Sequence, residues 1–170
     1  GITLTGNLSG SVACSGKSFA LPDIQGNAAL EGAGSVSAQK GQAPTPFDLR
    51  LESGLQDQQV KIAALRVNSA MLQMNASGAI NLRDMTFDLV YDIASDNLQT
   101  LMKQAAAFIP NLPRDSPLTK FSGQIKRIAG TLRGAAADLE IAAKAELSRV
   151  DLFWAQLDEL GAEIEVKKNV

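Results

Sequence analysis

Two short stretches of the chain carry residue types that catalytic motifs use. Gly10–Ser18 ends in Gly16-Lys17-Ser18, which is also how a phosphate-binding loop ends. Five residues separate its two glycines, however, where that motif has four, and no helical pattern follows. We therefore do not interpret this stretch as a nucleotide site.

A second motif combines a serine, a lysine and an amide. Ser37–Lys40 has the spacing Ser-x-x-Lys and Ser95–Asn97 reads Ser-Asp-Asn, as in penicillin-binding enzymes. The Lys-Thr-Gly motif of those enzymes is missing, and their Ser-x-x-Lys opens a helix, whereas Ser37 ends an expected strand. Ser95 is better explained as a helix cap.

Carboxylates are the remaining candidates for acid–base chemistry. Asp88 and Asp92 share the polar side of one expected strand, and Glu163 and Glu165 share that of another. Solvated strand faces carry such residues routinely. The chain has no histidine, which removes the commonest general base and metal ligand near neutral pH. We expect no enzyme activity, no metal and no cofactor.

Cys14 is the single cysteine, so no disulfide forms within the chain. It falls among the apolar positions of its strand, and we expect a small buried hydrophobe. No histidine is available to activate its thiol. A chain without cysteine pairs is compatible with the cytoplasm or the periplasm.

The dominant feature of the sequence is an alternation of apolar and polar residues. Successive side chains of a strand point to opposite faces, so this pattern predicts strands with one apolar and one polar face. Gly54–Gln59 reads as a polar turn, and the apolar parity slips in two places, which suggests bulges. The expected strands lie in 2–14, 24–38, 47–52, 60–68 with a bulge, 71–82, 85–94, 121–132 with a bulge between Ile125 and Ile128, 139–154 and 163–167.

One segment has a helical period. Apolar residues recur at helical spacing over 96–109, with Ser95 or Asp96 as the expected cap and Pro110 as the end. This divides the chain into a curved sheet segment over 1–94, a helix and Pro-rich loop over 95–118, and a continuing sheet segment over 119–170. Many glycines lie inside strands, which indicates either loose, bulged strands or a strongly curved sheet with an unobstructed concave side.

Composition excludes several classes of function. Aromatic residues make up 5% of the chain, the net charge is −2, and no basic stripe stands out, so we expect no nucleic-acid binding. No apolar run is long enough to cross a bilayer as a helix, and no signal peptide is visible. We expect the chain to be a piece of a longer protein that carries any targeting signal elsewhere.

The strand texture resembles that of a known family. Leu4–Val12 reads LTGNLSGSV and Met74–Leu82 reads MNASGAINL, and both are similar to the leucine- and glycine-rich strands of AsmA/TamB-like proteins. Ala145–Trp154, continuing through Leu157 and Leu160, resembles a later TamB-type repeat. The resemblance is in the pattern of strands and glycines over most of the chain and includes no invariant catalytic motif. It is closest to a TamB segment.

The resemblance implies a fold and a role. Such proteins are anchored in the inner membrane of Gram-negative bacteria and cross the periplasm. Their sheet curls into an open apolar trough, the β-taco, which is implicated in moving phospholipids towards the outer membrane. TamB-like members are also linked to outer-membrane protein assembly.

We therefore expect a mainly β chain, a curved and strongly twisted sheet that forms an open apolar trough, with one short amphipathic helix. Its function would be to shield phospholipid acyl chains in a periplasmic conduit; the alternatives are a scaffold that pairs strand edges with client proteins, and an ordinary sandwich core in which the same residues face a second sheet. The residues expected to line the groove are Ile2, Leu4, Leu8, Val12, Leu30, Val36, Leu49, Leu51, Leu72, Met74, Ile80, Leu82, Phe87, Leu89, Ile93, Leu132, Leu139, Ile141 and Leu147.

Overall fold

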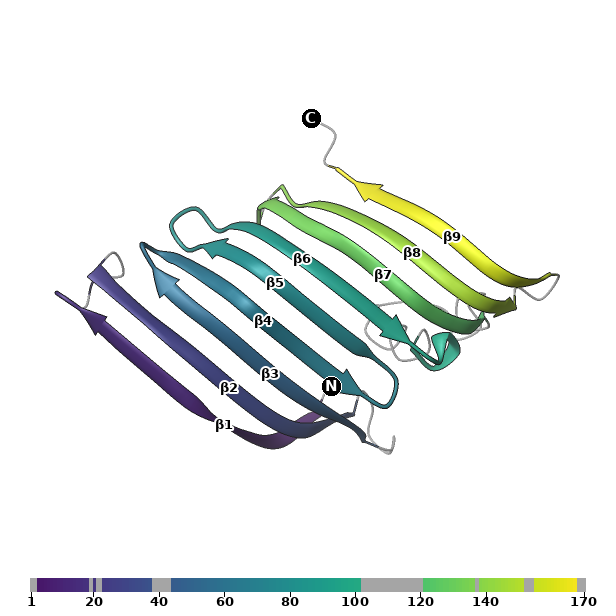
Figure 1. Cartoon of the computed structure of the whole chain (residues 1–170), viewed down its shortest axis with the longest axis horizontal. Coiled ribbons are helices and arrows are strands. Elements are labelled where there is room, and N and C mark those ends of the chain that lie inside the picture. Colours follow the sequence, from purple (N-terminus) through teal and green to yellow (C-terminus); the bar gives the residue numbers. More distant parts are fainter. Residues whose placement is uncertain are drawn as a thin grey trace.

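The computed structural model describes residues 3–18, 20, 23–37, 44–101, 121–136, 138–151 and 155–167. These residues form one nine-stranded antiparallel sheet in which every strand pairs with its neighbours in sequence (Figure 1). The strands are β1 (Thr3–Gly16), β2 (Ile24–Ser37), β3 (Thr45–Gln56), β4 (Gln59–Ser69), β5 (Gln73–Asn81), β6 (Thr86–Ser95), β7 (Ser122–Ala135), β8 (Glu140–Asp151) and β9 (Gln156–Val166).

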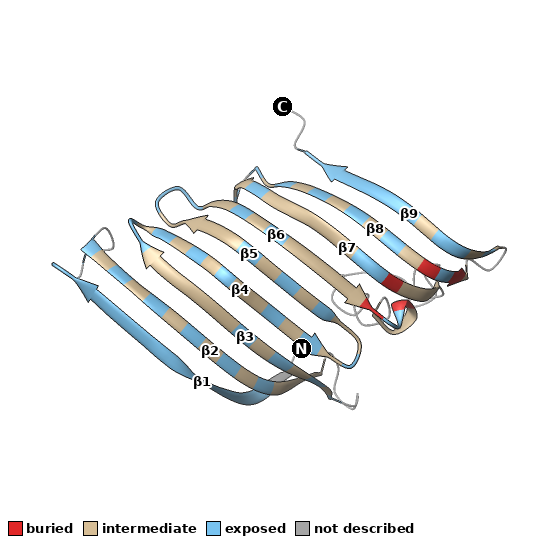
Figure 2. Cartoon of the chain, viewed as in Figure 1, coloured by how far each residue is buried: buried red, intermediate tan, exposed pale blue. Residues whose placement is uncertain are grey.

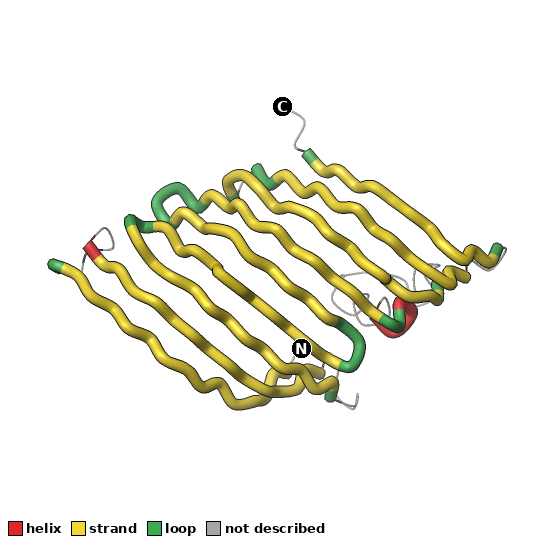
Figure 3. Tube along the Cα trace, viewed as in Figure 1, coloured by secondary structure: helices red, strands yellow, loops and turns green. Residues whose placement is uncertain are grey.

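The sheet is a single curved and twisted layer, and β1 and β9 lie at its opposite edges (Figure 3). The prediction of a mainly β, open and trough-like fold is therefore confirmed. The strand ranges expected from alternation match β1, β2 and β4 to β8 to within a few residues, because period-two patterning follows the strand pleat. β3 extends beyond the expected range at both ends, and β9 begins at Gln156, although only its end around Ile164 and Val166 was expected.

Tight turns connect the middle strands. Asp57 and Gln58 have φ angles of 49° and 64° and join β3 to β4, as in the two-residue hairpin turns that need positive φ at both positions. The polar turn expected over Gly54–Gln59 is thus shorter than predicted, because β3 continues to Gln56 and β4 begins at Gln59. Cross-strand pairing of Gly54 and Leu55 with β4 overrides their local turn signal.

The predicted bulges are present and keep the faces aligned. The pairing of β4 with β5 shifts between Ile62 and Leu65, and that of β7 with β8 shifts between Ile125 and Arg127. One extra residue at each point moves the apolar positions from one parity to the other. Without these shifts, the second half of each strand would expose its apolar residues on the polar face.

The helix begins at Leu98, three residues after β6 ends at Ser95. Residues 98–101 are helical in the described part of the chain, and the rest of the predicted 96–109 helix lies outside it. Asn97 is the cap, because its Oδ1 accepts a hydrogen bond from the Thr100 amide at 2.9 Å. The expectation of Ser95 or Asp96 as the cap was wrong, since the Ser95 hydroxyl instead donates to the Met71 carbonyl at 2.5 Å.

Candidate functional site

The strand register gives each face of the sheet one chemical character. Residues directly opposite each other across an antiparallel ladder point to the same side. Three adjacent rows that cross all nine strands are composed mainly of apolar residues: Leu8, Gly32, Leu49, Val67, Met74, Ile93, Ile128, Ala145 and Ala162; Gly10, Leu30, Leu51, Leu65, Ala76, Tyr91, Gly130, Ala143 and Ile164; and Val12, Ala28, Ser53, Ile62, Gly78, Leu89, Leu132, Ile141 and Val166. We call this side the apolar face.

No second layer covers the apolar face in the part of the chain that the structure describes. Buried hydrophobic residues in that part are Leu98, Ile125 and Val150, which gather near one end of β6, β7 and β8 (Figure 2). On the edge strand β1 the apolar side chains are largely exposed to solvent: Leu8 is 61% exposed and Val12 is 67% exposed. The sandwich alternative would need a partner sheet that these residues do not provide.

The area of this face is large for an uncovered surface. Nine strands spaced about 4.8 Å apart span about 38 Å, and a strand of nine residues is about 30 Å long. The face therefore covers on the order of 1,000 Å², whereas contiguous apolar patches on soluble monomers rarely exceed a few hundred Å². A patch of this size indicates an interaction surface.

Most of the predicted groove residues lie on this face. Ile2 is outside the described residues, Leu4 belongs to β1 with no description of its side chain, and Leu72, Leu82 and Leu139 flank strands. The fourteen others occupy apolar rows of the sheet: Leu8, Val12, Leu30, Val36, Leu49, Leu51, Met74, Ile80, Phe87, Leu89, Ile93, Leu132, Ile141 and Leu147.

Several residues of the face were not among those predicted. They come mainly from the bulged strands and from β9, where a simple alternation breaks: Phe47, Leu55, Val60, Ile62, Leu65, Val67, Tyr91, Ile125, Ile128, Leu160, Ile164 and Val166. A shift of apolar parity around Ala63 and Ala64 was the signal that could have identified the members in β4.

Cys14 differs from its prediction. Its thiol is exposed, because β1 is an edge strand and Gly26 stands opposite it on β2. A glycine supplies no side chain to cover the sulfur. The alternating pattern correctly places Cys14 on the apolar face, but it cannot show that this part of the face is exposed.

Comparison of the chain with protein-family models, with curated proteins and with solved structures finds no match.

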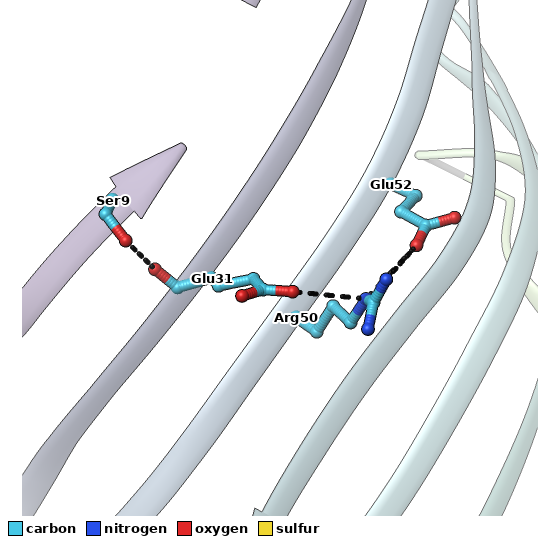
Figure 4. Close-up of polar contacts among 4 residues, drawn as sticks. All are labelled: Ser9, Glu31, Arg50 and Glu52. Carbon is cyan, nitrogen blue, oxygen red and sulfur yellow. Dashed lines mark hydrogen bonds and ion pairs between the residues drawn. The ribbon is translucent and has the colours of Figure 1, made fainter. Parts of the chain in front are cut away.

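The opposite face, here called the polar face, carries ion pairs between neighbouring strands. Arg50 on β3 contacts Glu31 on β2 (Nε to Oε1, 3.5 Å) and Glu52 on its own strand (Nη2 to Oε1, 2.9 Å), and Ser9 on β1 donates a hydrogen bond to the Glu31 carbonyl (Figure 4). Such exposed ion pairs each contribute little to stability, but they make this face hydrophilic.

Ion pairs continue on the polar face of the second half of the sheet. Arg127 contacts Asp92 at 2.5 Å and Lys144 contacts Glu163 at 2.7 Å. The hydrogen bond from Lys144, followed by its charge, lowers the pKa of the Glu163 carboxyl, and the same two effects from Asp92 raise the pKa of Arg127. These contacts pair charges across neighbouring strands on the polar face.

Hollows in the described residues open on the polar face. One lies between the side chains of Asn7, Asp48 and Arg66, where short residues stand beside long charged ones. A second lies over β1 to β4, a third over β1 to β3 and a fourth between β4 and β6, with Asn, Ser, Gln, Lys and Arg side chains in their walls. These are open, water-facing depressions, and none of the four collects a set of groups suited to acid–base catalysis.

The structure also locates the motif residues set aside above. Gly10 and Gly16 belong to β1, so their amides are part of a strand and do not form a phosphate cradle. Within the described ranges no group of three metal-ligating side chains comes together. Asp88 contacts Arg133 at 3.0 Å across β6 and β7. Helices in the described part of the chain are too short to span a membrane.

Proposed function

We propose that the apolar face shields the acyl chains of phospholipids, as a segment of a conduit between the two membranes of a Gram-negative bacterium. One observation carries the proposal: rows of mainly apolar residues continue from β1 to β9, on a face that no second sheet among the described residues covers. The resemblance to AsmA/TamB-like proteins supports the same role and a periplasmic location in a longer protein anchored in the inner membrane.

The energetics favour a lipid ligand. A phospholipid with two acyl chains exposes about 30 methylene groups, and at about 0.8 kcal/mol each their transfer through water costs over 20 kcal/mol. A face on the order of 1,000 Å² removes a large part of that cost by contact alone. No nucleophile, metal or general base is required.

The composition of the face also fits a ligand that slides. Its members are mainly Leu, Ile, Val, Ala and Gly, with Phe47, Phe87 and Tyr91 as the aromatic residues among the paired positions. Aliphatic side chains make few directional contacts, so we expect acyl chains to move along the face and head groups to be distinguished only weakly.

Photo-crosslinking from adjacent positions of β6 tests the proposal. Leu89 lies on the apolar face, opposite Gly78 and Leu132, while its neighbour Val90 points to the polar face and is 50% exposed. A photoreactive residue at position 89 should capture phospholipid from liposomes, and the same residue at position 90 should not. Equal capture at both positions, or none at either, would contradict the proposal.

A second candidate function is supported by the open edges of the sheet. No described strand pairs with the outer side of β1, so its backbone groups can accept an added strand from a client protein. In that case a photoreactive residue in β1 should capture a polypeptide, whereas one at position 89 should capture no lipid.

A further inference from the structure

One side chain in the middle of the apolar face carries a hydroxyl group that the sheet does not satisfy. Tyr91 on β6 stands in the central apolar row, between Ala76 of β5 and Gly130 of β7. Its hydroxyl forms no hydrogen bond within the described part of the chain, where no fully buried polar side-chain atom lacks a partner. The Tyr91 oxygen is therefore accessible from the surface of the face.

This hydroxyl lies low over the neighbouring strand. A Cβ atom at Gly130 would lie 2.6 Å from the Tyr91 oxygen and 2.7 Å from its Cζ, so the tip of the ring stands over β7, close to the backbone. Ile128 and Leu132 flank Gly130 on the apolar side of β7, and Ala143 is its partner on β8. A ligand that lies across Ile128 and Leu132 therefore covers the Tyr91 hydroxyl.

The three apolar rows contain one other hydroxyl, that of Ser53 on β3. A serine hydroxyl is attached directly to Cβ and can turn to a backbone group of its own strand. The Tyr91 hydroxyl cannot do so, because it is held at the far end of a rigid ring that lies over Gly130. Within these rows Tyr91 thus presents a donor at a fixed position.

A phospholipid on the face must satisfy this donor. Acyl chains that cover Tyr91 remove its water, and a donor left without a partner in apolar surroundings is unfavourable. Hydrocarbon carries no acceptor. The first acceptor beyond the chains is the carbonyl oxygen of the ester that joins each chain to glycerol. The phosphate is charged, and its desolvation beside apolar side chains would be far more costly.

From this geometry we infer that Tyr91 donates a hydrogen bond to an ester carbonyl of the bound phospholipid and so fixes the start of an acyl chain over β7. The inference rests on the proposed function and adds a recognition element to it. The face then distinguishes lipids by the linkage between chain and glycerol, and not by the head group. Both partners in this bond are neutral, so it places no charge on the apolar face.

Competition between two lipids that differ in this linkage tests the inference. The full chain is mixed with liposomes that contain equal amounts of diester and diether phosphatidylcholine of the same chain length, and the bound lipids are quantified by mass spectrometry. The ether linkage has no carbonyl group. The unmodified chain should retain about fivefold more of the diester lipid, which corresponds to about 1 kcal/mol.

Tyr91→Phe removes the donor and keeps the ring over Gly130. This variant should bind the two lipids in the ratio at which the liposomes contain them, because less diester lipid is retained while binding of the diether lipid is unchanged. Ser53→Ala is the matched control, since it removes a hydroxyl from the same face, and it should keep the preference of the unmodified chain. Circular dichroism should report the same strand content for both variants.

Infrared spectroscopy of the bound diester lipid provides a readout that a change in packing would not reproduce. An ester carbonyl that accepts a hydrogen bond absorbs at a lower frequency than a free one. The lower-frequency component should be present with the unmodified chain and with Ser53→Ala, and it should be absent with Tyr91→Phe.

The outcomes separate this inference from the proposed function. Equal capture of the two lipids by the unmodified chain would overturn the role of Tyr91 and leave lipid binding in place. A preference for the diester lipid that persists in Tyr91→Phe would also overturn it. If the unmodified chain captures neither lipid, the proposed function fails and the inference fails with it.

Discussion

Tyr91 on β6 lies over Gly130 on β7, its direct partner in the ladder. A Cβ atom at position 130 would lie 2.6 Å from the Tyr91 hydroxyl oxygen and 2.7 Å from its Cζ, and still closer to the carbonyl oxygen of Ala142 on β8. The glycine therefore leaves the space that the aromatic ring occupies. Glycine–aromatic pairs of this kind allow a large ring to lie close to the strand beside it.

Gly130→Ala should destabilise the sheet. The added methyl group overlaps the Tyr91 ring and the backbone of β8, and overpacking of this kind costs about 1–3 kcal/mol. Urea unfolding followed by circular dichroism measures the change. Gly161→Ala is the control, because nothing lies within 4 Å of a Cβ at that position, and its effect should stay within about 0.5 kcal/mol. Equal effects at the two positions would show that steric overlap is not the cause.

Leu89→Asp should abolish lipid binding and leave the sheet folded. Leu89 stands between Gly78 and Leu132 in an apolar row, so the carboxylate would lie against acyl chains. A charge in such surroundings costs about 2.5–3.5 kcal/mol, which corresponds to a more than tenfold loss of bound lipid. Mass spectrometry of phospholipid that copurifies with the chain gives the measurement.

Val90→Asp is the matched control for that experiment, since Val90 is 50% exposed on the polar face. It should retain the lipid content of the unmodified chain, and circular dichroism should report the same strand content for both variants. If the Leu89 variant keeps its lipid while folded, the apolar face is not the route of the acyl chains.

Ser95→Ala should weaken the end of β6. Ser95 is buried, with 4% of its surface exposed, and its hydroxyl donates to the Met71 carbonyl at 2.5 Å. Removing the hydroxyl leaves a partly buried carbonyl without this donor, which costs about 1–3 kcal/mol. Urea unfolding checks the loss. Ser77→Ala, at an exposed position of β5, should change stability by less than about 0.5 kcal/mol, and a comparable loss there would contradict the assignment.

Lys144→Gln should raise the pKa of Glu163 towards its ordinary value of about 4.3, since the lysine is the partner that lowers it. Because the pKa of Glu163 is lower in the folded protein than in the unfolded chain, its ionised carboxylate stabilises the fold at pH values above the unfolded pKa. This stabilisation is lost as the pH falls through the folded pKa. Carbon-detected NMR titration of the glutamate carboxyls measures the shift. An unchanged Glu163 pKa in the variant would show that Lys144 is not its cause, and added salt should reduce the difference.

Most of the strands were predictable because the alternation of apolar and polar residues is regular along most of their length. In β5, every second residue from Met74 to Ile80 faces the apolar rows, as the sequence pattern indicates. The bulge in β4 was predicted from irregularity alone. The change of apolar parity at Ala63 and Ala64 indicates this bulge, but only the pairing with β3 and β5 shows that it places Ile62 and Leu65 on the same side.

Other features were missed because they depend on contacts distant in sequence. Cys14 was expected to be buried, but burial requires a covering neighbour, and the opposite residue is Gly26. Ser95 was expected as a helix cap, but its hydroxyl binds a carbonyl 24 residues away, and Asn97 takes the capping role. In both cases the side chain responds to a strand that local sequence does not specify.

Taken alone, the sequence determined which side of each strand is apolar, because successive residues of an extended chain must point to opposite sides. It could not determine whether those sides meet in one face, or whether a second layer covers them. Only the tertiary structure decided that the register aligns nine strands in a single open layer. Register and coverage are set by pairing between distant residues, and a local pattern of side chains carries no information about the layer that lies opposite it.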